Sequence, residues 1–550
     1  MKLKSLKPRL HNIMFHTHTV SGIIISFALF VIFYAGAIAL FMDELYQWEN
    51  PNARVETVSP DSINYDETIE LIQKEIPTFD KSKQFGIVPP TEVRPIVTFY
   101  GSKKVDDKKT KRFTAYINPI TKELHTRSEP LTHMARTIYE LHYFRQIPVI
   151  GIYLSGLVGF FFLFAVITGL LTHWKNIANK FYAFTTKGNW KQIWTNGHVS
   201  LGFITLPFQV IYAITGSLLG LSLLLLAPTA FLTFNGDTTE VIKVVRPDRG
   251  IKYDDKAKDI TNEITFNSTY KKVSSENPKF NVTYLYAMNY GKEDGTISVN
   301  VTDHKSLGSD GNYIYALKDG ELLSAIVPEK KAYSKGALAV LIKLHYATYG
   351  GIFLKIIYFI LAMVTCYVII SGVMIWRTAR DNKKYTDKQR RFHHRVTKFY
   401  LAITLSMFPS VGLIFIANKL VPLEVIDRTF YVNSVFFLGW LSLTILGLFW
   451  NNYRKLNRNY LFIGSILAII IPIANGIMTG DWIWKTLISK QYYVFSVDFT
   501  WLTIGIFGLL ICLIYLKSNS KFDKLSNKDT STPKIKQEQK KNTILSEATI

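Results

Sequence analysis

The fold is decided by two stretches of sequence that share one pattern, HTVSGIIISFALFVIFYAG at residues 18–36 and HVSLGFITLPFQVIYAITG at residues 198–216. Each stretch begins with a histidine and carries one glycine four residues later and another eighteen residues later. In an α-helix these offsets return to within about 40° and 0° of the histidine, so the three residues share one helix face. Each stretch is also apolar enough to cross a membrane.

A second pair of matching segments follows. Leu141-His142-Tyr143 precedes an apolar stretch with Gly169 twenty-seven residues after His142, and Leu344-His345-Tyr346 precedes another with Gly372 twenty-seven residues after His345. The repeating unit is therefore a helix, a polar segment of about a hundred residues and a second helix. Because both copies run in the same direction, they predict a pseudo-two-fold axis along the membrane normal, with equivalent residues facing each other.

The four repeated histidines are the candidate site residues. The axis pairs His18 with His198 at the cytoplasmic edge and His142 with His345 at the exported edge. A haem iron takes two axial imidazoles, and a porphyrin between helices needs small residues where the ring approaches. We therefore expect two haems, each with one histidine pair as its axial iron ligands. They are expected to be b-type, because the chain has no Cys-x-x-Cys-His attachment motif.

Other interpretations of the histidines stay open. A single histidine at a membrane boundary is most often an interfacial polar residue. A zinc site is disfavoured, because no compact set of Cys, Asp or Glu accompanies the histidines. His16 and His173 also lie near the cytoplasmic edge, and either of them is an alternative for one of the proposed haem ligands there.

The composition is that of a membrane protein. Of 550 residues 48% are apolar and 14% aromatic, which is too apolar for one soluble core. Cys366 and Cys512 fall inside apolar windows, so we expect them to be buried core residues rather than a disulfide or a metal site. Windows of roughly twenty apolar residues predict about eight transmembrane helices, at residues 20–41, 149–171, 200–228, 352–376, 398–417, 432–450, 460–479 and 498–516.

The positive charge marks one side of the membrane. The formal net charge is +23, but the basic residues are not gathered on one soluble domain, so nucleic acid is not an expected partner. They occur before the first span, between the second and third, after the fourth and after the sixth. By the positive-inside rule these loops and both termini are cytoplasmic.

The two long polar segments lie on the exported side. The first has an amphipathic helix pattern at 66–76 and strand patterns at 95–100 and 112–117, and the second has strand patterns at 296–301 and 313–317 followed by a turn. Each is expected to fold as an α+β domain. The chain is thus divided into the N-terminus with the first span (1–45), a first exported domain (46–140), the second and third spans (141–229), a second exported domain (230–340), the fourth span (341–380), a basic cytoplasmic loop (381–397), an accessory bundle of four spans (398–516) and a polar tail expected to be disordered (517–550).

Over residues 10–380 the chain resembles the PepSY-associated transmembrane helix family, which includes bacterial inner-membrane siderophore reductases. In residues 116–123 it resembles the family's strand-turn signature, with Lys122 where the family has a glycine. Thr19 and Val20 stand where the family typically has an arginine and a tryptophan. The remaining residues that carry the resemblance are His18, Gly22, Gly36, His142, Gly169, His198, Gly202, Thr215, Gly216, His345, Ser371 and Gly372.

The resemblance implies periplasmic PepSY-like domains and electron transfer through two b-type haems to a ferric siderophore. No glycine-rich nucleotide fingerprint is present, so a separate cytoplasmic donor or the quinol pool must supply the electrons. The leading hypothesis is thus an inner-membrane di-haem b oxidoreductase that reduces a periplasmic ferric siderophore or other ferric chelate during iron acquisition. The alternative is a non-enzymatic PepSY-domain membrane protein that binds peptides, proteases or envelope partners. A permease for siderophore or haem is a third possibility.

Overall fold

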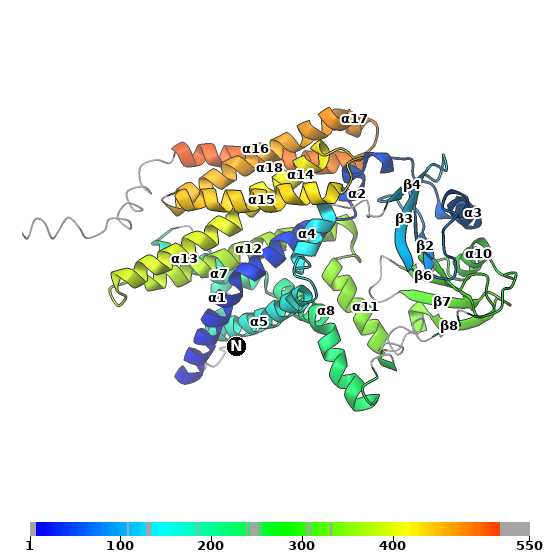
Figure 1. Cartoon of the computed structure of the whole chain (residues 1–550). Helices are drawn as coiled ribbons and strands as arrows, with labels where there is room; N and C mark the ends of the chain where they lie inside the picture. The colour runs from blue at the N-terminus through cyan, green and yellow to red at the C-terminus, as the bar shows by residue number, and fades with distance from the viewer. Residues whose placement is uncertain are drawn as a thin grey trace, which may run out of the picture.

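The computed structural model describes residues 7–517, apart from 107–108, 128–133, 183, 186, 238–239, 242–250, 252, 255, 304–306, 308–309, 331–332 and 451. The predicted tail, apart from its first residue, lies outside the described residues. The described chain forms a set of long helices with a β-sheet at one end (Figure 1). The basic turn at residues 381–386, and the C-terminal end of the last described helix, lie at the opposite end.

The long helices agree with the predicted spans, and the chain is a multi-pass membrane protein. Seven helices within the described residues are long and apolar enough to cross a membrane, and a bent pair adds an eighth if it counts as one span. Their bounds are α1 (Pro8–Ala39), α5 (Ile150–Thr172), the pair α7 (Trp190–Ile204) and α8 (Leu206–Thr233), α12 (Gly351–Arg380), α13 with α14 (Asp387–Leu405 and Met407–Leu420), α15 (Arg428–Phe449), α16 (Tyr453–Thr479) and α18 (Tyr492–Lys517).

The third span departs from the prediction of one continuous helix over 200–228. The chain bends by 71° between α7 and α8, with Thr205 at the break. Pro207 lies in the first turn of α8, where its missing N–H and fixed φ suit a helix start but not a helix interior. Apolar periodicity alone does not detect such a bend, because both halves remain apolar.

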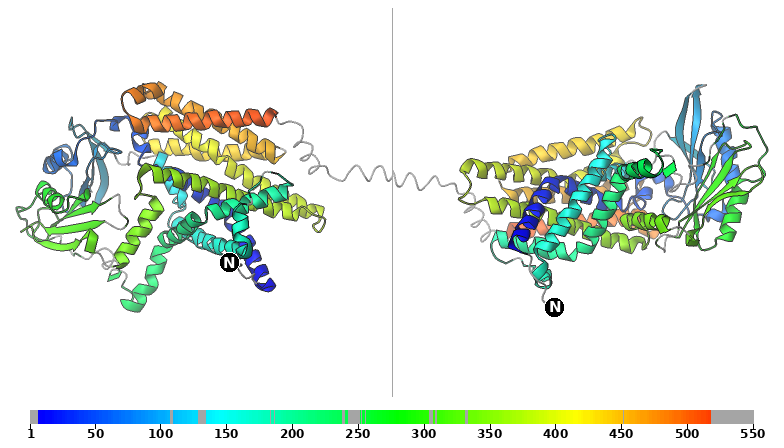
Figure 2. Two further views of the ribbon diagram at one scale, coloured as in Figure 1. Left: turned by 180° about the vertical axis from the view of Figure 1, so that it is seen from behind. Right: turned by 90° about the horizontal axis from the view of Figure 1, so that it is seen from below.

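The two long polar segments contribute their strands to one eight-stranded sheet. Its strand order is β4-β3-β2-β1-β5-β6-β7-β8, and the halves meet where β1 pairs antiparallel with β5. Pairing these two strands leaves neither of them as an exposed edge. Figure 2 shows the sheet at the same end of the helices from two further sides. The strands are β1 (Phe85–Val88), β2 (Val97–Asp106), β3 (Lys109–Ile117), β4 (Leu124–Arg127), β5 (Asn281–Met288), β6 (Thr296–Thr302), β7 (Gly311–Ala316) and β8 (Leu322–Ile326).

One helix from each segment packs on this sheet, α3 (Tyr65–Glu75) and α10 (Phe266–Glu276). The side chain of Asp66 accepts hydrogen bonds from the N–H groups of Phe266 (2.9 Å) and Asn267 (3.2 Å), so a carboxylate of α3 caps α10. Together with the eight strands these helices form what we call the sheet layer. The helix predicted at 66–76 and the four strand patterns are confirmed, whereas the polar sequence of α10 gave no clear signal.

Two short helices connect the sheet layer to the spans, α4 (Met134–His142) before α5 and α11 (Tyr333–Tyr346) before α12. Two residues after the histidine of each, the backbone turns left-handed, with φ of 56° at Phe144 and 52° at Ala347. A left-handed residue commonly ends a helix. Each histidine therefore lies in the last turn of its short helix.

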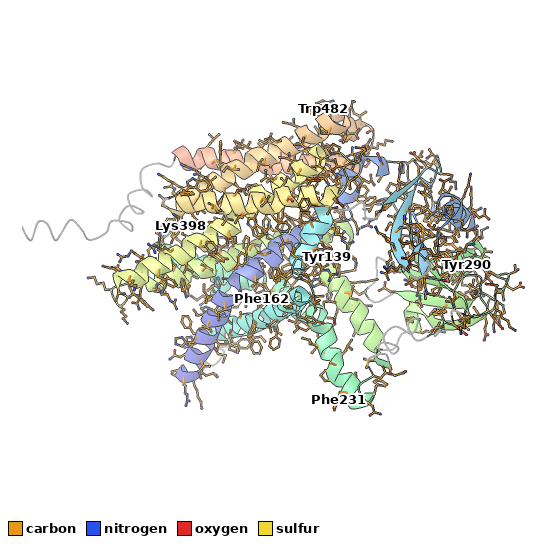
Figure 3. The ribbon with its side chains drawn as sticks, viewed as in Figure 1. Tyr139, Phe162, Phe231, Tyr290, Lys398 and Trp482 are labelled. Atoms are coloured by element: carbon orange, nitrogen blue, oxygen red, sulfur yellow. The ribbon has the colours of Figure 1, made fainter. Side chains whose placement is uncertain are left out.

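The helices that follow α12 form the accessory bundle, α13 to α18, which includes the short α17 (Ile483–Ile488). Its helices pack against one another and against α2 (Leu45–Glu49). Cys366 and Cys512 are buried free thiols, as expected. In Figure 3, Phe162 and Tyr139 lie where the helices meet, and Tyr290 lies in the sheet layer. The ring of Phe162 packs 5.4 Å from that of Phe33.

Lys122 adopts a left-handed conformation, with φ of 61°, in the turn between β3 and β4. Because an L-residue pays roughly 1 kcal/mol for this conformation, Lys122→Gly is expected to raise the free energy of unfolding of the sheet layer by about that amount. The lost ion pair with Glu67 is exposed and contributes little. Urea-dependent proteolysis of the sheet layer measures the change. Lys122→Ala, which keeps the strained backbone, should give no gain, and equal stability of the two variants would contradict the assignment.

Candidate functional site

The four predicted histidines meet as two pairs. The ring centres of His18 and His198 lie 6.0 Å apart, and those of His142 and His345 lie 5.9 Å apart. We call His142 and His345 the sheet-side pair, because α4 and α11 lead out of the sheet layer, and His18 and His198 the distal pair. Gly36 of α1 lies beside His142. It follows His18 by five helical turns, so the two pairs are separated by roughly 27 Å along α1.

Each histidine uses its Nδ1 atom to bind a neighbouring helix. Nδ1 of His18 donates to the carbonyl of Ala165 (2.8 Å), that of His142 to the carbonyl of Ile32 (2.7 Å) and that of His198 to the carbonyl of Val368 (2.9 Å). A carbonyl only accepts, so Nδ1 carries the proton and Nε2 keeps its lone pair.

His345 follows the same rule with a hydroxyl in place of a carbonyl. Its Nδ1 lies 2.9 Å from Oγ1 of Thr215. That hydroxyl already donates to the carbonyl of Ile211 (2.7 Å), so it accepts from the ring. Within the described residues, Nε2 of none of the four histidines has a hydrogen-bond partner. All four rings are held in the tautomer of a metal-ligating histidine, whose other nitrogen bonds the protein.

The repeated glycines lie against these rings. A Cβ on Gly36 would lie 2.5 Å from Nδ1 of His142, and one on Gly169 would lie 3.0 Å from Cε1 of His18. The corresponding distances are 3.2 Å for Gly372 from His198 and 3.9 Å for Gly216 from His345. The preserved spacings of eighteen and twenty-seven residues therefore bring each glycine to a histidine of the neighbouring helix.

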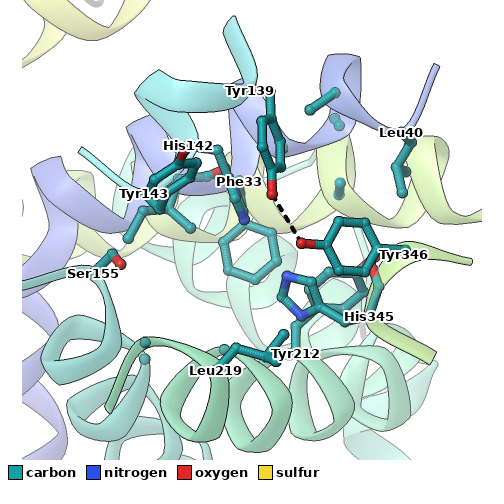
Figure 4. Close-up of a pocket in the computed structure, with 18 of the residues that line it drawn as sticks. Phe33, Leu40, Tyr139, His142, Tyr143, Ser155, Tyr212, Leu219, His345 and Tyr346 are labelled. Atoms are coloured by element: carbon teal, nitrogen blue, oxygen red, sulfur yellow. Dashed lines mark hydrogen bonds between the residues drawn. The ribbon is translucent and has the colours of Figure 1, made fainter. Parts of the chain in front are cut away.

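A cavity of about 430 Å³ adjoins the sheet-side pair. His142 and His345 enter it from two different helices, and the hydroxyls of Tyr139 and Tyr346 meet beside them at 2.9 Å (Figure 4). The volume falls within the range of ligand pockets. Its lining is mostly apolar, and the charged residues at its margin are Asp43, Arg145 and Lys355.

The sheet-side histidines are neutral near pH 7. Burial lowers the pKa of His142, and burial together with the nearby His142 lowers the pKa of His345 to about 3. Neutral imidazole is the form that binds a metal. No proton has to leave these rings for metal to bind.

The pairs fit a haem better than a bare metal ion. Since an imidazole nitrogen bonds a metal at about 2.0 Å and the ring centre lies about 1 Å behind it, two imidazoles on opposite sides of one metal have ring centres about 6 Å apart. Both observed separations match this distance. Among the described residues, no group of three or more His, Cys, Asp or Glu is placed to hold a metal ion. Two protein ligands suit an iron whose porphyrin supplies the other four.

A family model matches the part of the chain that carries both histidine pairs. The family described as the PepSY-associated TM region matches residues 15–379, which is more than half of the chain. The chain belongs to the PepSY-associated transmembrane family. The match ends just before α13, so the accessory bundle lies beyond the family region. No curated protein matches the chain.

Two features of the site in this PepSY-associated protein bear on the sequence hypotheses. His173 lies at the end of α5, near enough to the distal pair for its pKa to depend on His18, while His16 is exposed on α1. Both stay alternatives for a distal ligand.

The partners of the Nδ1 atoms were not predicted, because every residue has a backbone carbonyl and the sequence does not show which one a histidine will bind. Thr215 and Ser371 directly precede the two repeated glycines of the second copy, Gly216 and Gly372, and were the only hydroxyl-bearing partners that the sequence comparison had noted.

Gly36→Ala is expected to displace the ring of His142, because the added Cβ would lie 2.5 Å from Nδ1. The purified variant should therefore lose about half of its haem, namely that of the sheet-side pair. A pyridine haemochrome assay measures the content. Gly336→Ala on α11 is the matched control, since a Cβ there meets nothing within 4 Å. The same haem content in both variants would contradict the proposed contact.

Proposed function

We propose that this protein is a di-haem b oxidoreductase of the bacterial inner membrane, which carries electrons across the bilayer to a periplasmic ferric siderophore or other ferric chelate. In this proposal the sheet layer is a duplicated pair of periplasmic PepSY-like domains, and both termini are cytoplasmic. The electron donor is a cytoplasmic protein or quinol.

One observation carries the proposal: two partly buried histidine pairs lie at two depths, each with the ring separation of a bis-imidazole metal site. A single site would serve chemistry on one side of the membrane. Two sites separated by roughly 27 Å along α1 span most of a hydrocarbon layer about 30 Å thick. This arrangement favours transfer between the two faces over a scaffold or a permease.

A bound b-type haem supplies a one-electron iron couple at each pair. The histidines would hold the iron through Nε2, and the carbonyls of Ala165, Ile32 and Val368 fix the orientation of three of the rings. Hydrogen bonding at Nδ1 would make each ring a stronger electron donor to a bound metal. The partial burial of the rings would also affect the reduction potential.

The sheet-side pair is the one closest to an acceptor outside the bilayer. Lys343, two residues before His345, forms an ion pair with Asp310 (3.2 Å) and donates to the carbonyl of Asp303 (2.9 Å). These contacts join α11 to the loop between β6 and β7. The sheet layer therefore stands directly beside the sheet-side pair, where a bulky ferric chelate can approach.

Purified wild-type protein is expected to contain about two b-type haems per chain, because it has two ligand pairs. His142→Ala and His345→Ala should each leave about one haem, and His18→Ala and His198→Ala should each remove the other. His125→Ala, on the exposed side of β4, is the control and should keep both. Folded protein that carries no haem after expression in haem-replete cells would refute the proposal and favour the non-enzymatic alternative.

Reduced protein should be reoxidised by a ferric siderophore, because the ferric iron of each chelate would accept one electron from the reduced protein. Stopped-flow absorption after dithionite reduction measures the rate. The same siderophore loaded with gallium, which accepts no electron, is the control. Ferric chelates that reoxidise the protein no faster than unrelated acceptors of similar potential would refute the reductase assignment. Only the claim that the protein carries electrons would then remain.

A further inference from the structure

The helix that carries His142 needs support from elsewhere in the protein. α4 has nine residues, and an isolated helix of this length is not stable in water. Its N–H groups at the first turn have no partner within the helix. His142 lies at its other end, about 12 Å away along the axis. A group that holds the first turn of α4 therefore helps to position His142, whose ring is also bound by the carbonyl of Ile32.

Glu49 holds that first turn. Its carboxylate accepts hydrogen bonds from the backbone N–H of Met134 and from that of Ala135 (3.4 Å), the first two residues of α4. Glu49 is 1% exposed, and Met134 and Ala135 are buried as well. A carboxylate at a helix N-terminus is stabilising, and more so when partly buried.

The accessory bundle holds Glu49 in turn. Asn418 of α14 donates from Nδ2 to the same carboxylate (3.2 Å). Arg428, at the start of α15, donates to the carbonyls of Asn418 and Val421. Lys419 donates to the carbonyl of Trp48 and lies 3.8 Å from the centre of its ring. Burial raises the pKa of Glu49 to about 7, and the nearby Arg428 and Lys419 offset this effect only in part.

Two further contacts join the same elements. The hydroxyl of Thr137, in the middle of α4, donates to Oδ1 of Asn433 of α15 (2.6 Å). Nε1 of Trp48, the residue before Glu49, donates to Oδ1 of Asp498 of α18 (2.7 Å). α4 thus has its first turn, its middle and its capping residue all fastened to helices outside the family region.

We propose that Glu49 is a positioning residue for the sheet-side site: held by α14 and α15, it fixes the first turn of α4 and through that helix the ring of His142. This assigns the accessory bundle the task of orienting one ligand of the sheet-side haem. The inference rests on the proposed function for the identity of the bound group, but the contacts themselves do not.

The equivalent helix in the second copy is supported differently. α11 has fourteen residues, packs against α8 and is joined to the sheet layer through Lys343. The two ligands of one pair are therefore held by different parts of the protein. Loss of Glu49 should affect His142 and leave the distal pair unchanged.

The first test measures α4 itself. Hydrogen–deuterium exchange of residues 134–142 in the full-length protein should be about tenfold faster in Glu49→Ala than in the wild type, as expected for a lost helix cap. Glu49→Gln keeps one side-chain oxygen and should restore much of the protection. Asp66→Ala removes the matched carboxylate that caps α10, and should leave exchange in α4 unchanged.

The second test reads the haem. The low-spin ferric electron paramagnetic resonance signal of the sheet-side haem, identified as the one that His345→Ala removes, should shift or lose intensity in Glu49→Ala. It should be retained in Asp66→Ala, and the distal signal should not change in either variant.

If Glu49→Ala does not fold, Thr137→Val tests the same support by the same two measurements. Unchanged exchange in α4 together with an unchanged sheet-side signal would overturn the inference. Protein without haem would refute the proposed function instead, while exchange in α4 would still test the role of Glu49.

Discussion

The contact between a histidine ring and a glycine of the neighbouring helix is the constraint on which the transmembrane site depends. A helix carbonyl points toward the residue four positions later. Gly169 follows Ala165 by four residues, Gly36 follows Ile32, and Gly372 follows Val368. Because the glycine has no side chain, the imidazole can lie on it and reach the carbonyl. Each ring is thereby fixed in place and in tautomer, with Nε2 directed away from the helix that holds it.

This constraint explains what could be predicted from the sequence. The repeat predicts a pseudo-two-fold axis, and this axis was enough to pair His18 with His198 and His142 with His345. The histidine–glycine contacts between neighbouring helices were not predicted. The spans and four of the eight strands followed from hydrophobic periodicity. The helix bend at Thr205 was missed because both halves of the span remain apolar. The joined sheet was missed because nothing local in β1 or β5 specifies that these two strands pair.

The support of α4 by the accessory bundle was also beyond sequence analysis. Glu49 and Met134 are eighty-five residues apart, and Glu49 and Asn418 are 369 apart. A lone glutamate in a short connecting segment carries no pattern that predicts a helix cap. The accessory bundle contains no histidine after His394 and had no assigned role. Contacts with α2 and α4 connect the accessory bundle to His142 of the sheet-side pair. α11 connects His345 of the same pair to the sheet layer.

The central claim is that each histidine pair holds one planar group between its two rings. It is tested most directly by an electron cryomicroscopy map of the wild-type protein purified from haem-replete cells. We expect flat density continuous with Nε2 of both histidines at the sheet-side pair and at the distal pair. Rings that contact each other or water, with no planar density between them at either pair, would contradict the claim.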